Sequence, residues 1–148
     1  MKIDRTQSLN QLEGSAPAKP AYDSHVVQES HRLRDIPLSQ LTTENLRLLI
    51  GQNIGLDHLV PLALERVEEQ PLAGGDFYAG DLLVTLLRLP ASFWQARQDW
   101  RRRLDLIVKP VVERYNSSSH HQQEKLSHTF DSLKPAYEAF SRVDSASA

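Results

Sequence analysis

The segment from Ile36 to Trp94 carries apolar residues at three- and four-residue steps, and this spacing constrains the fold more than any other feature of the chain. After Leu56 the apolar positions are Leu59, Val60, Ala63, Leu64 and Val67. The acidic residues between and after them are Glu65, Glu68 and Glu69. One helical face therefore points inward and the other outward. Since no segment alternates between apolar and polar residues over a useful length, the sequence predicts an all-α fold without a sheet.

Two further helices are predicted on the N-terminal side of this stripe, because polar residues that can cap a helix precede each of them. Asp23 or Ser24 can open the first, over Tyr22–Leu33, because such side chains accept bonds from free backbone amides at a helix start. Thr42 or Thr43 is the N-cap candidate of the second helix. The apolar residues of that second helix are Leu46, Leu49 and Ile50.

The segment LLVTLLRL, residues 82–89, is apolar on every side and predicts the most buried helix of the fold. It follows the turn LAGGDFYAGD, whose glycines permit positive φ. Gly80 or Asp81 starts the helix, where a carboxylate is favoured by the helix dipole. We expect Phe77 and Tyr78 to plug the edge of the core.

Prolines fall inside two later stripes of helical spacing. Apolar residues recur from Phe93 to Tyr115 and again from Leu126 to Phe140. Proline lacks a backbone donor and crowds the preceding turn, so Pro110 should kink or interrupt the first stripe, giving two pieces that meet near residue 109. Pro135 weakens the prediction of a helix in the second stripe.

Length and composition predict one domain. A chain of 148 residues can bury roughly two-thirds of the surface that it exposes when unfolded. We expect a short extended or flexible N-terminal arm over residues 1–21, a single helical domain over 22–142, formed as a compact multi-helix bundle, and a disordered tail over 143–148. The arm contains Gly14, Pro17 and Pro20 among small residues.

The chain has no cysteine, which excludes disulfides and permits a reducing compartment. Its first twenty residues lack the apolar centre of a signal peptide, and no segment approaches the ~20 apolar residues that span a bilayer. We therefore expect a cytoplasmic protein that does not enter a membrane.

Three histidines near the C-terminus raise the question of a metal site. His121 and His128 are seven residues apart and share a helix face, with His120 beside them. No third or fourth ligand stands at a fixed spacing from them. We expect no metal and no cofactor.

A second chemical interpretation combines His58, Asp76 and Asp81 as the groups of a small metal-dependent hydrolase. The simpler interpretation gives the glycines and Asp81 to the turn and to the helix start. We favour the simpler one and expect no catalytic residues, and the hydrolase remains an alternative.

Charge is distributed unevenly along the chain. Between residues 53 and 87 there are six acidic side chains and one base, Arg66, so the local charge is −5. Between residues 97 and 115, six bases and three acids give +3, with a cluster at WRRRLD, residues 100–105. The two stretches can pair within one molecule. The acidic stretch otherwise suits a basic partner, and the WRRR cluster leaves a nucleic-acid-contacting regulator as a further alternative, although the net charge of −2 gives it no support.

The chain resembles the immunity proteins of bacterial contact-dependent growth inhibition systems over about Gln11–Leu106. The main stretch is LRLLIGQNIGLDHLVPLALERVEEQPLAGGDFYAGDLLVTLLRLPASFW, preceded by the pieces EG, PAYDSHVV, HRLR and PLSQLT. IGQNIGL, VPLALE and GDFYAGDLL are the most specific parts, because their joint order and spacing are hard to meet by accident.

This resemblance implies a cytoplasmic bacterial antidote that binds the toxic C-terminal domain of a sibling surface effector, often a nuclease. We expect inhibition by stoichiometric occlusion, without turnover and without direct contact to nucleic acid. Acidic side chains would mimic the phosphates that a basic nuclease cleft attracts. The residues expected at the partner surface are Glu65, Glu68, Glu69, Asp57, Asp76 and Tyr78.

Overall fold

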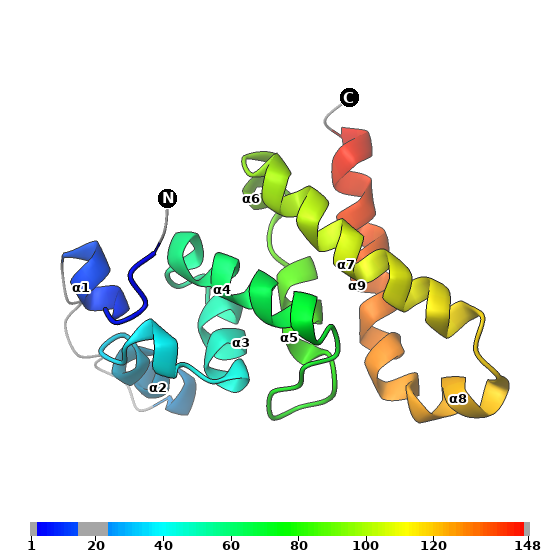
Figure 1. The fold of residues 1–148 in the computed structure, drawn as a ribbon, viewed down its shortest axis with the longest axis horizontal. Helices are drawn as coiled ribbons and strands as arrows, with labels where there is room; N and C mark the ends of the chain where they lie inside the picture. Colours follow the sequence, from blue (N-terminus) through cyan, green and yellow to red (C-terminus); the bar gives the residue numbers. More distant parts are fainter. Residues whose placement is uncertain (1–2, 15–23, 147–148) are drawn as a thin grey trace.

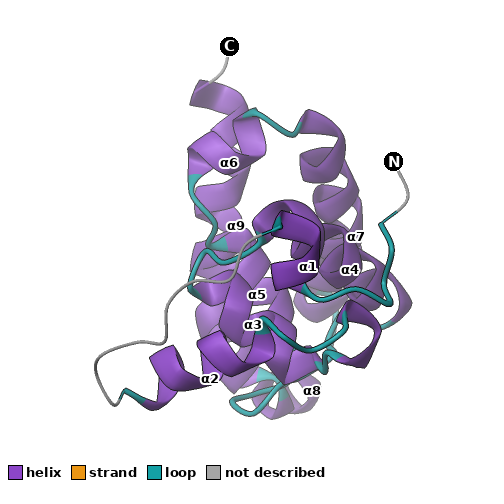
Figure 2. Cartoon of the chain, turned by 90° about the vertical axis from the view of Figure 1, so that its left-hand side faces the viewer, coloured by secondary structure: helices purple, strands orange, loops and turns teal. Residues whose placement is uncertain are grey.

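The chain folds as a bundle of α-helices, and the structure, a computed structural model, describes residues 3–14 and 24–146, with side chains through residue 142 (Figure 1). Within those residues there are helices and loops but no strands (Figure 2), which confirms the predicted all-α class. The helices are α1 Leu9–Glu13, α2 His25–Leu33, the 3-10 helix η1 Leu38–Gln40, α3 Thr43–Gly51, α4 Leu56–Glu69, α5 Asp81–Leu87, α6 Ala91–Gln95, α7 Gln98–Asn116, α8 His120–Lys125 and α9 Ser127–Ala146.

The predicted helix starts are found at two caps. Thr42 is the N-cap of α3, where its hydroxyl accepts from the Asn45 amide at 3.1 Å and the Asn45 side chain accepts from the Thr42 amide at 3.0 Å. This reciprocal pair satisfies two backbone donors that a helix start leaves free. Ser24 occupies the cap position of α2 but makes no side-chain capping bond.

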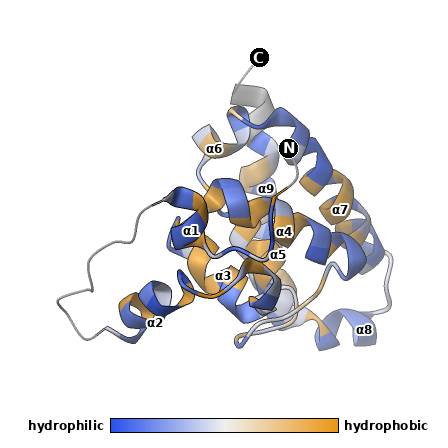
Figure 3. Ribbon diagram, turned by 60° about the vertical axis from the view of Figure 1, so that its left-hand side comes forward, coloured by the Kyte–Doolittle hydropathy of each residue, from blue (hydrophilic) through white to orange (hydrophobic). Residues whose placement is uncertain are grey.

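Helix α5 is the centre of the core. It packs against α3 and α4 on one side and against α9 on the other, and its apolar side chains Leu82, Leu83, Val84, Leu86 and Leu87 are all buried. The hydropathy colouring shows apolar residues concentrated on the central helices of the bundle, such as α3 (Figure 3). The apolar run therefore forms the most buried helix, as the sequence predicts.

Helix α1 lies inside the segment that the sequence predicts as an extended arm. Ser8 and Gln11 form a capping box around it, and Leu9 is 0% exposed. A Cβ at Gly55 would come within 2.7 Å of the Leu9 side chain, so α1 packs closely against the start of α4. An extended conformation is therefore wrong for residues 9–13, because one capped turn suffices to place a leucine in the core. Residues 15–21 of the predicted arm lie outside the described residues.

Helix α7 runs unbroken through Pro110, so the predicted division near residue 109 is wrong (Figure 1). Because Pro110 has no amide hydrogen, the carbonyl of Leu106 one turn earlier has no helical donor. Both residues lie on the exposed side of the helix, where water can bind that carbonyl. Helix α9 likewise continues through Pro135 and reaches Ala146, whereas a disordered tail is predicted from residue 143. The last two residues of that tail, 147–148, lie outside the described residues.

Candidate functional site

The loop between α4 and α5 is held by a buried carboxylate. Asp81, which is 2% exposed, accepts from the Gly75 amide at 2.6 Å and from the Phe77 amide at 3.1 Å. Gly80 precedes it with a φ of 85°, in the left-handed region that favours glycine. Asp81 thus fixes the loop that leads into its own helix, which accords with the structural interpretation of this turn.

A second carboxylate ties the same loop to α3. Glu44 accepts from the Asp76 amide at 3.0 Å and forms a two-pronged contact with Arg47, at 2.6 and 2.5 Å. The hydrogen bond from Arg47 lowers the pKa of Glu44 below its ordinary value, against the opposing effect of burial. The guanidinium of Arg47 also lies 4.4 Å from the centre of the Phe77 ring.

The two aromatic residues of the loop have different surroundings. Tyr78 packs against the core, as predicted. Phe77 is 70% exposed, so the prediction that it plugs the core edge is wrong. The bonds that Asp81 makes to the loop amides turn the Phe77 ring toward Arg47 at the surface instead.

The structure does not bring His58 close to Asp76, as the hydrolase alternative requires. Asp76 lies beside the start of α3, where its amide donates to Glu44, and Arg66 of α4 reaches the same place, since it donates to Thr43 at 3.3 Å. His58 lies about 12 Å from Arg66 along the axis of α4, at a rise of about 1.5 Å per residue. In the part of the chain that the structure describes, no group of three His, Cys, Asp or Glu side chains is arranged to hold a metal ion.

Three of the four acidic side chains of α4 are paired with arginines. Asp57 binds Arg97 at 2.5 Å, at the start of α7. Glu65 binds Arg5 at 2.5 Å. Glu68 binds Arg103 of α7. The acidic and basic stretches therefore neutralise each other in part, which is one of the two outcomes that the sequence leaves open.

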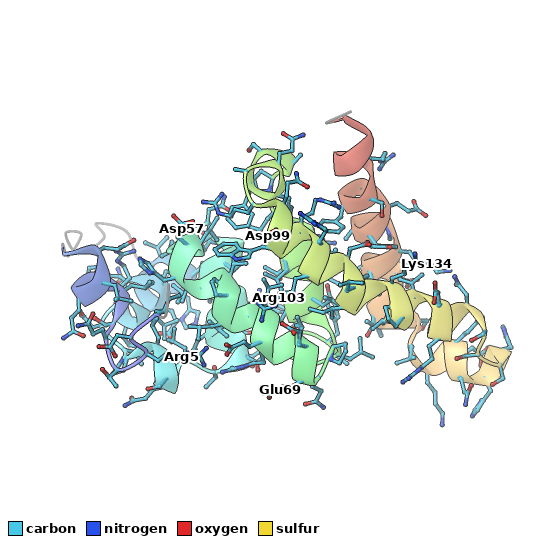
Figure 4. All side chains as sticks on the ribbon, turned by 45° about the horizontal axis from the view of Figure 1, so that its top comes forward. Arg5, Asp57, Glu69, Asp99, Arg103 and Lys134 are labelled. Carbon is cyan, nitrogen blue, oxygen red and sulfur yellow. The ribbon has the colours of Figure 1, made fainter. Side chains whose placement is uncertain are left out.

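The other two predicted partner-binding acids are exposed and form no ion pair with any residue that the structure describes. Glu69 lies at the exposed end of α4, whereas Asp76 lies in the loop, where its charge also acts on the guanidinium of Arg47. Figure 4 shows Glu69 pointing away from the ribbon, at the opposite end of α4 from Asp57.

A broad groove opens beside the end of α4, between α7, α8 and the start of α9. Its volume is about 1110 Å³. It is lined mainly by apolar groups, and the lining residues that matter here are Leu72, Leu106, Ile107, Val111, Leu126 and Phe130. The rings of Tyr115 and Phe130 stack across it with centroids 3.8 Å apart, joining α7 to α9. The groove is therefore formed mainly by α7, α8 and α9, with the end of α4 and the loop after it on one side.

Helix α9 is also fixed to α7 outside the groove. Tyr137 donates to Asp105 at 3.0 Å. Burial, with a smaller contribution from this bond, raises the pKa of Tyr137. Together with the Tyr115–Phe130 stack, this bond sets the separation of the two helices.

The family is decided by a comparison with protein-family models. The model described as CDI immunity proteins matches residues 11–104, more than half of the chain. The chain belongs to the family of CDI immunity proteins. The match extends from α1 to the first part of α7 and includes both α4 and the loop built on Asp81. Comparison with curated proteins and with solved structures gives no match.

The groove was not predicted from the sequence. One sequence signal for it was Leu106, an apolar residue that does not belong to the buried stripe of α7 and is 74% exposed. Only the arrangement of α7, α8 and α9 shows that other apolar residues surround it. No helix in the described ranges is long and apolar enough to cross a membrane.

Proposed function

We propose that this protein is a cytoplasmic antidote that binds the toxic C-terminal domain of the surface effector of its own system. It blocks that domain by stoichiometric occlusion, without turnover and without a cofactor. The observation that carries the proposal is the family match over residues 11–104. A nuclease is the toxin class that we propose, because an acidic surface complements the basic cleft of such an enzyme.

A rigid surface favours such a mechanism. The bundle has a continuous apolar core, and the loop between α4 and α5 is fixed by Asp81 and Glu44. Binding then costs little ordering of the antidote, so more of the interaction free energy appears as affinity.

The proposed toxin-facing residues are those named from the sequence: Asp57, Glu65, Glu68, Glu69, Asp76 and Tyr78. Their availability is unequal. Glu69 and Asp76 are exposed carboxylates without an ion pair in the described part of the chain, so we expect them to meet basic groups of the toxin first. Glu69 is the more available of the two, because the charge of Asp76 also acts on Arg47. Asp57, Glu65 and Glu68 would have to exchange an arginine of this chain for a cation of the toxin.

Protection of cells tests the proposed function. The toxin domain encoded in the same system is expressed with and without this protein, and growth is followed after induction. The proposal predicts restored growth when the antidote is present. Equal killing in both cultures would refute it.

A charge reversal tests the proposed residues. Glu69→Lys combined with Asp76→Lys should slow association with the toxin domain, and the effect should shrink as salt rises. The matched control is Asp131→Lys with Glu138→Lys, which reverses two exposed acids on α9. Equal association rates for the two double variants would remove Glu69 and Asp76 from the interface.

A further inference from the structure

The groove exposes apolar side chains that the fold does not use. Leu106 projects from α7 and is 74% exposed, while Ile107 and Val111 on the same helix are half-buried. Leu72 from the loop and Leu126 from the junction of α8 and α9 complete the apolar lining. Apolar surface gathered in one concave region of a soluble protein is typical of an interaction site.

The groove is large enough for a macromolecular occupant. At about 1110 Å³ it is at least as large as the pockets that usually hold small molecules, whose range is roughly 300–1,000 Å³. An α-helix with its side chains is about 10–12 Å across. The groove therefore has room for about two turns of a helix, which would lay its apolar face on α7.

The rim of the groove is cationic. The lining includes three cations, Arg103, Arg114 and Lys125, and one acid, Glu68. Glu68 and Arg103 pair with each other. Arg114 on α7 and Lys125 at the end of α8 are exposed and make no ion pair with a residue that the structure describes. Two uncompensated positive charges thus border the apolar surface and complement an acidic ligand.

We infer that this groove docks an amphipathic helix of the toxin domain that has an apolar face and acidic flanking residues. The inference rests on the proposed function and deepens it. The apolar face covers Leu106, Ile107 and Val111, and the acidic residues face Arg114 and Lys125. The toxin segment so bound is distinct in charge from the basic cleft that the acids of α4 complement.

The position of the groove in the chain suggests what it contributes. Most of its lining comes from α7 beyond Leu104, from α8 and from α9, whereas the family match ends at residue 104. The acids of α4 and the loop lie inside the match. The groove therefore lies mostly outside the residues shared with the family model, and we expect it to favour the chain's own toxin over the toxins of other systems.

Two groove variants with matched controls test the inference by the dissociation constant for the purified toxin domain of the same system. Leu106→Glu places a charge on the apolar surface and should raise the Kd by about 30-fold or more, as loss of a central anchor does. Its control, Val26→Glu, changes an exposed apolar residue of α2 and should alter the Kd by less than about twofold.

The second variant reverses the rim. Arg114→Glu with Lys125→Glu should weaken binding on the order of tenfold, mainly through slower association that recovers as salt rises. Its control, Lys109→Glu with Arg142→Glu, reverses two exposed cations that do not line the groove. All four variants should keep the melting temperature of the original protein within a few degrees, which separates loss of binding from loss of folding.

The outcomes distinguish the two proposals. If the original protein binds the toxin domain and restores growth, but both groove variants bind like their controls, the groove inference is wrong and the proposed function stands. If the original protein neither binds nor protects, the proposed function fails and the groove inference fails with it. If the groove variants dissociate a dimer of this protein without changing toxin binding, the occupant is a second copy and the inference is also wrong.

Discussion

Leucines in two regions of this protein have opposite surroundings. In the region built by α3, α4 and α5, almost every large apolar side chain is buried, and Leu86 is 0% exposed. Along α7 beyond Leu104, Val108 is buried, but Leu106 is 74% exposed and Ile107 and Val111 are only half-buried. In the first region the apolar surface is buried when the chain folds. The second keeps apolar surface in contact with solvent, where it is available for binding.

The polar groups differ in the same way. Asp81 of α5 and Glu44 of α3 each accept bonds from backbone amides of the loop before α5 and have little freedom to meet a partner. Along the groove, Arg114 and Lys125 are exposed. Folding free energy should therefore depend on the first set of groups and binding free energy on the second.

The largest contrast is expected between two leucines. Leu86→Ala should lower the free energy of unfolding by about 2–5 kcal/mol, because it leaves a cavity at the centre of the bundle. Leu106→Ala should change it by less than about 0.5 kcal/mol, since the side chain is mostly in water. Urea denaturation of both variants measures the difference. Similar losses would mean that the two regions are equally packed.

A smaller effect is expected at the buried carboxylate of the loop. Asp81→Ala leaves the amides of Gly75 and Phe77 without their acceptor and should cost about 1–3 kcal/mol of stability. Asp76→Ala, at an exposed site in the same loop, serves as the control and should cost much less. The comparison is made by thermal and urea unfolding, and equal effects would exclude Asp81 as the residue that fixes the loop.

Acid should weaken the loop region through Glu44. Its pKa is lowered in the folded state, mainly by the hydrogen bond from Arg47. A depressed pKa adds stability above the ordinary value of 4.5, and that contribution is lost as the pH falls through the folded-state pKa. The free energy of unfolding of Glu44→Gln should therefore differ most from that of the original protein at neutral pH, and the difference should shrink as the pH falls below 4.5. A constant difference from pH 7 to 3 would contradict this account.

The smallest effect is expected on the basic cluster. Arg102 pairs with Asp99 at 3.3 Å, and both side chains are mostly exposed. Exposed pairs of this kind contribute little, so Arg102→Ala should change the free energy of unfolding by no more than about 0.5 kcal/mol. A loss above 1 kcal/mol would place the WRRR cluster in the stabilising part of the molecule.

The buried region could be predicted from the sequence because its signals are local. The stripe after Leu56 and the cap at Thr42 act within one or two turns, and both helices form where they indicate. The start of α1 was missed although Ser8 and Gln11 form a local cap, because the short helix has one buried apolar residue and no stripe. Pro110 was misjudged because its effect depends on which face of α7 meets solvent.

The partner surface was less predictable for a different reason. Sequence shows that the residues of α4 are acidic, but only the packing of α7 against α4 shows that Arg97 and Arg103 neutralise Asp57 and Glu68. The groove joins residues from 68 to 130, and no local pattern brings those together. Tertiary contacts decide both which charged side chains pair within the protein and what shape the groove has.

Titration of the toxin domain with this protein tests the central claim most directly. A fixed amount of the toxin domain is mixed with increasing antidote, and the toxin activity that remains is measured after short and long incubation. Occlusion predicts a linear fall to zero at a fixed molar ratio, with the same end point at both times. Inactivation by a small fraction of that amount, increasing with time, would contradict the account, because it would show turnover instead of stoichiometric binding.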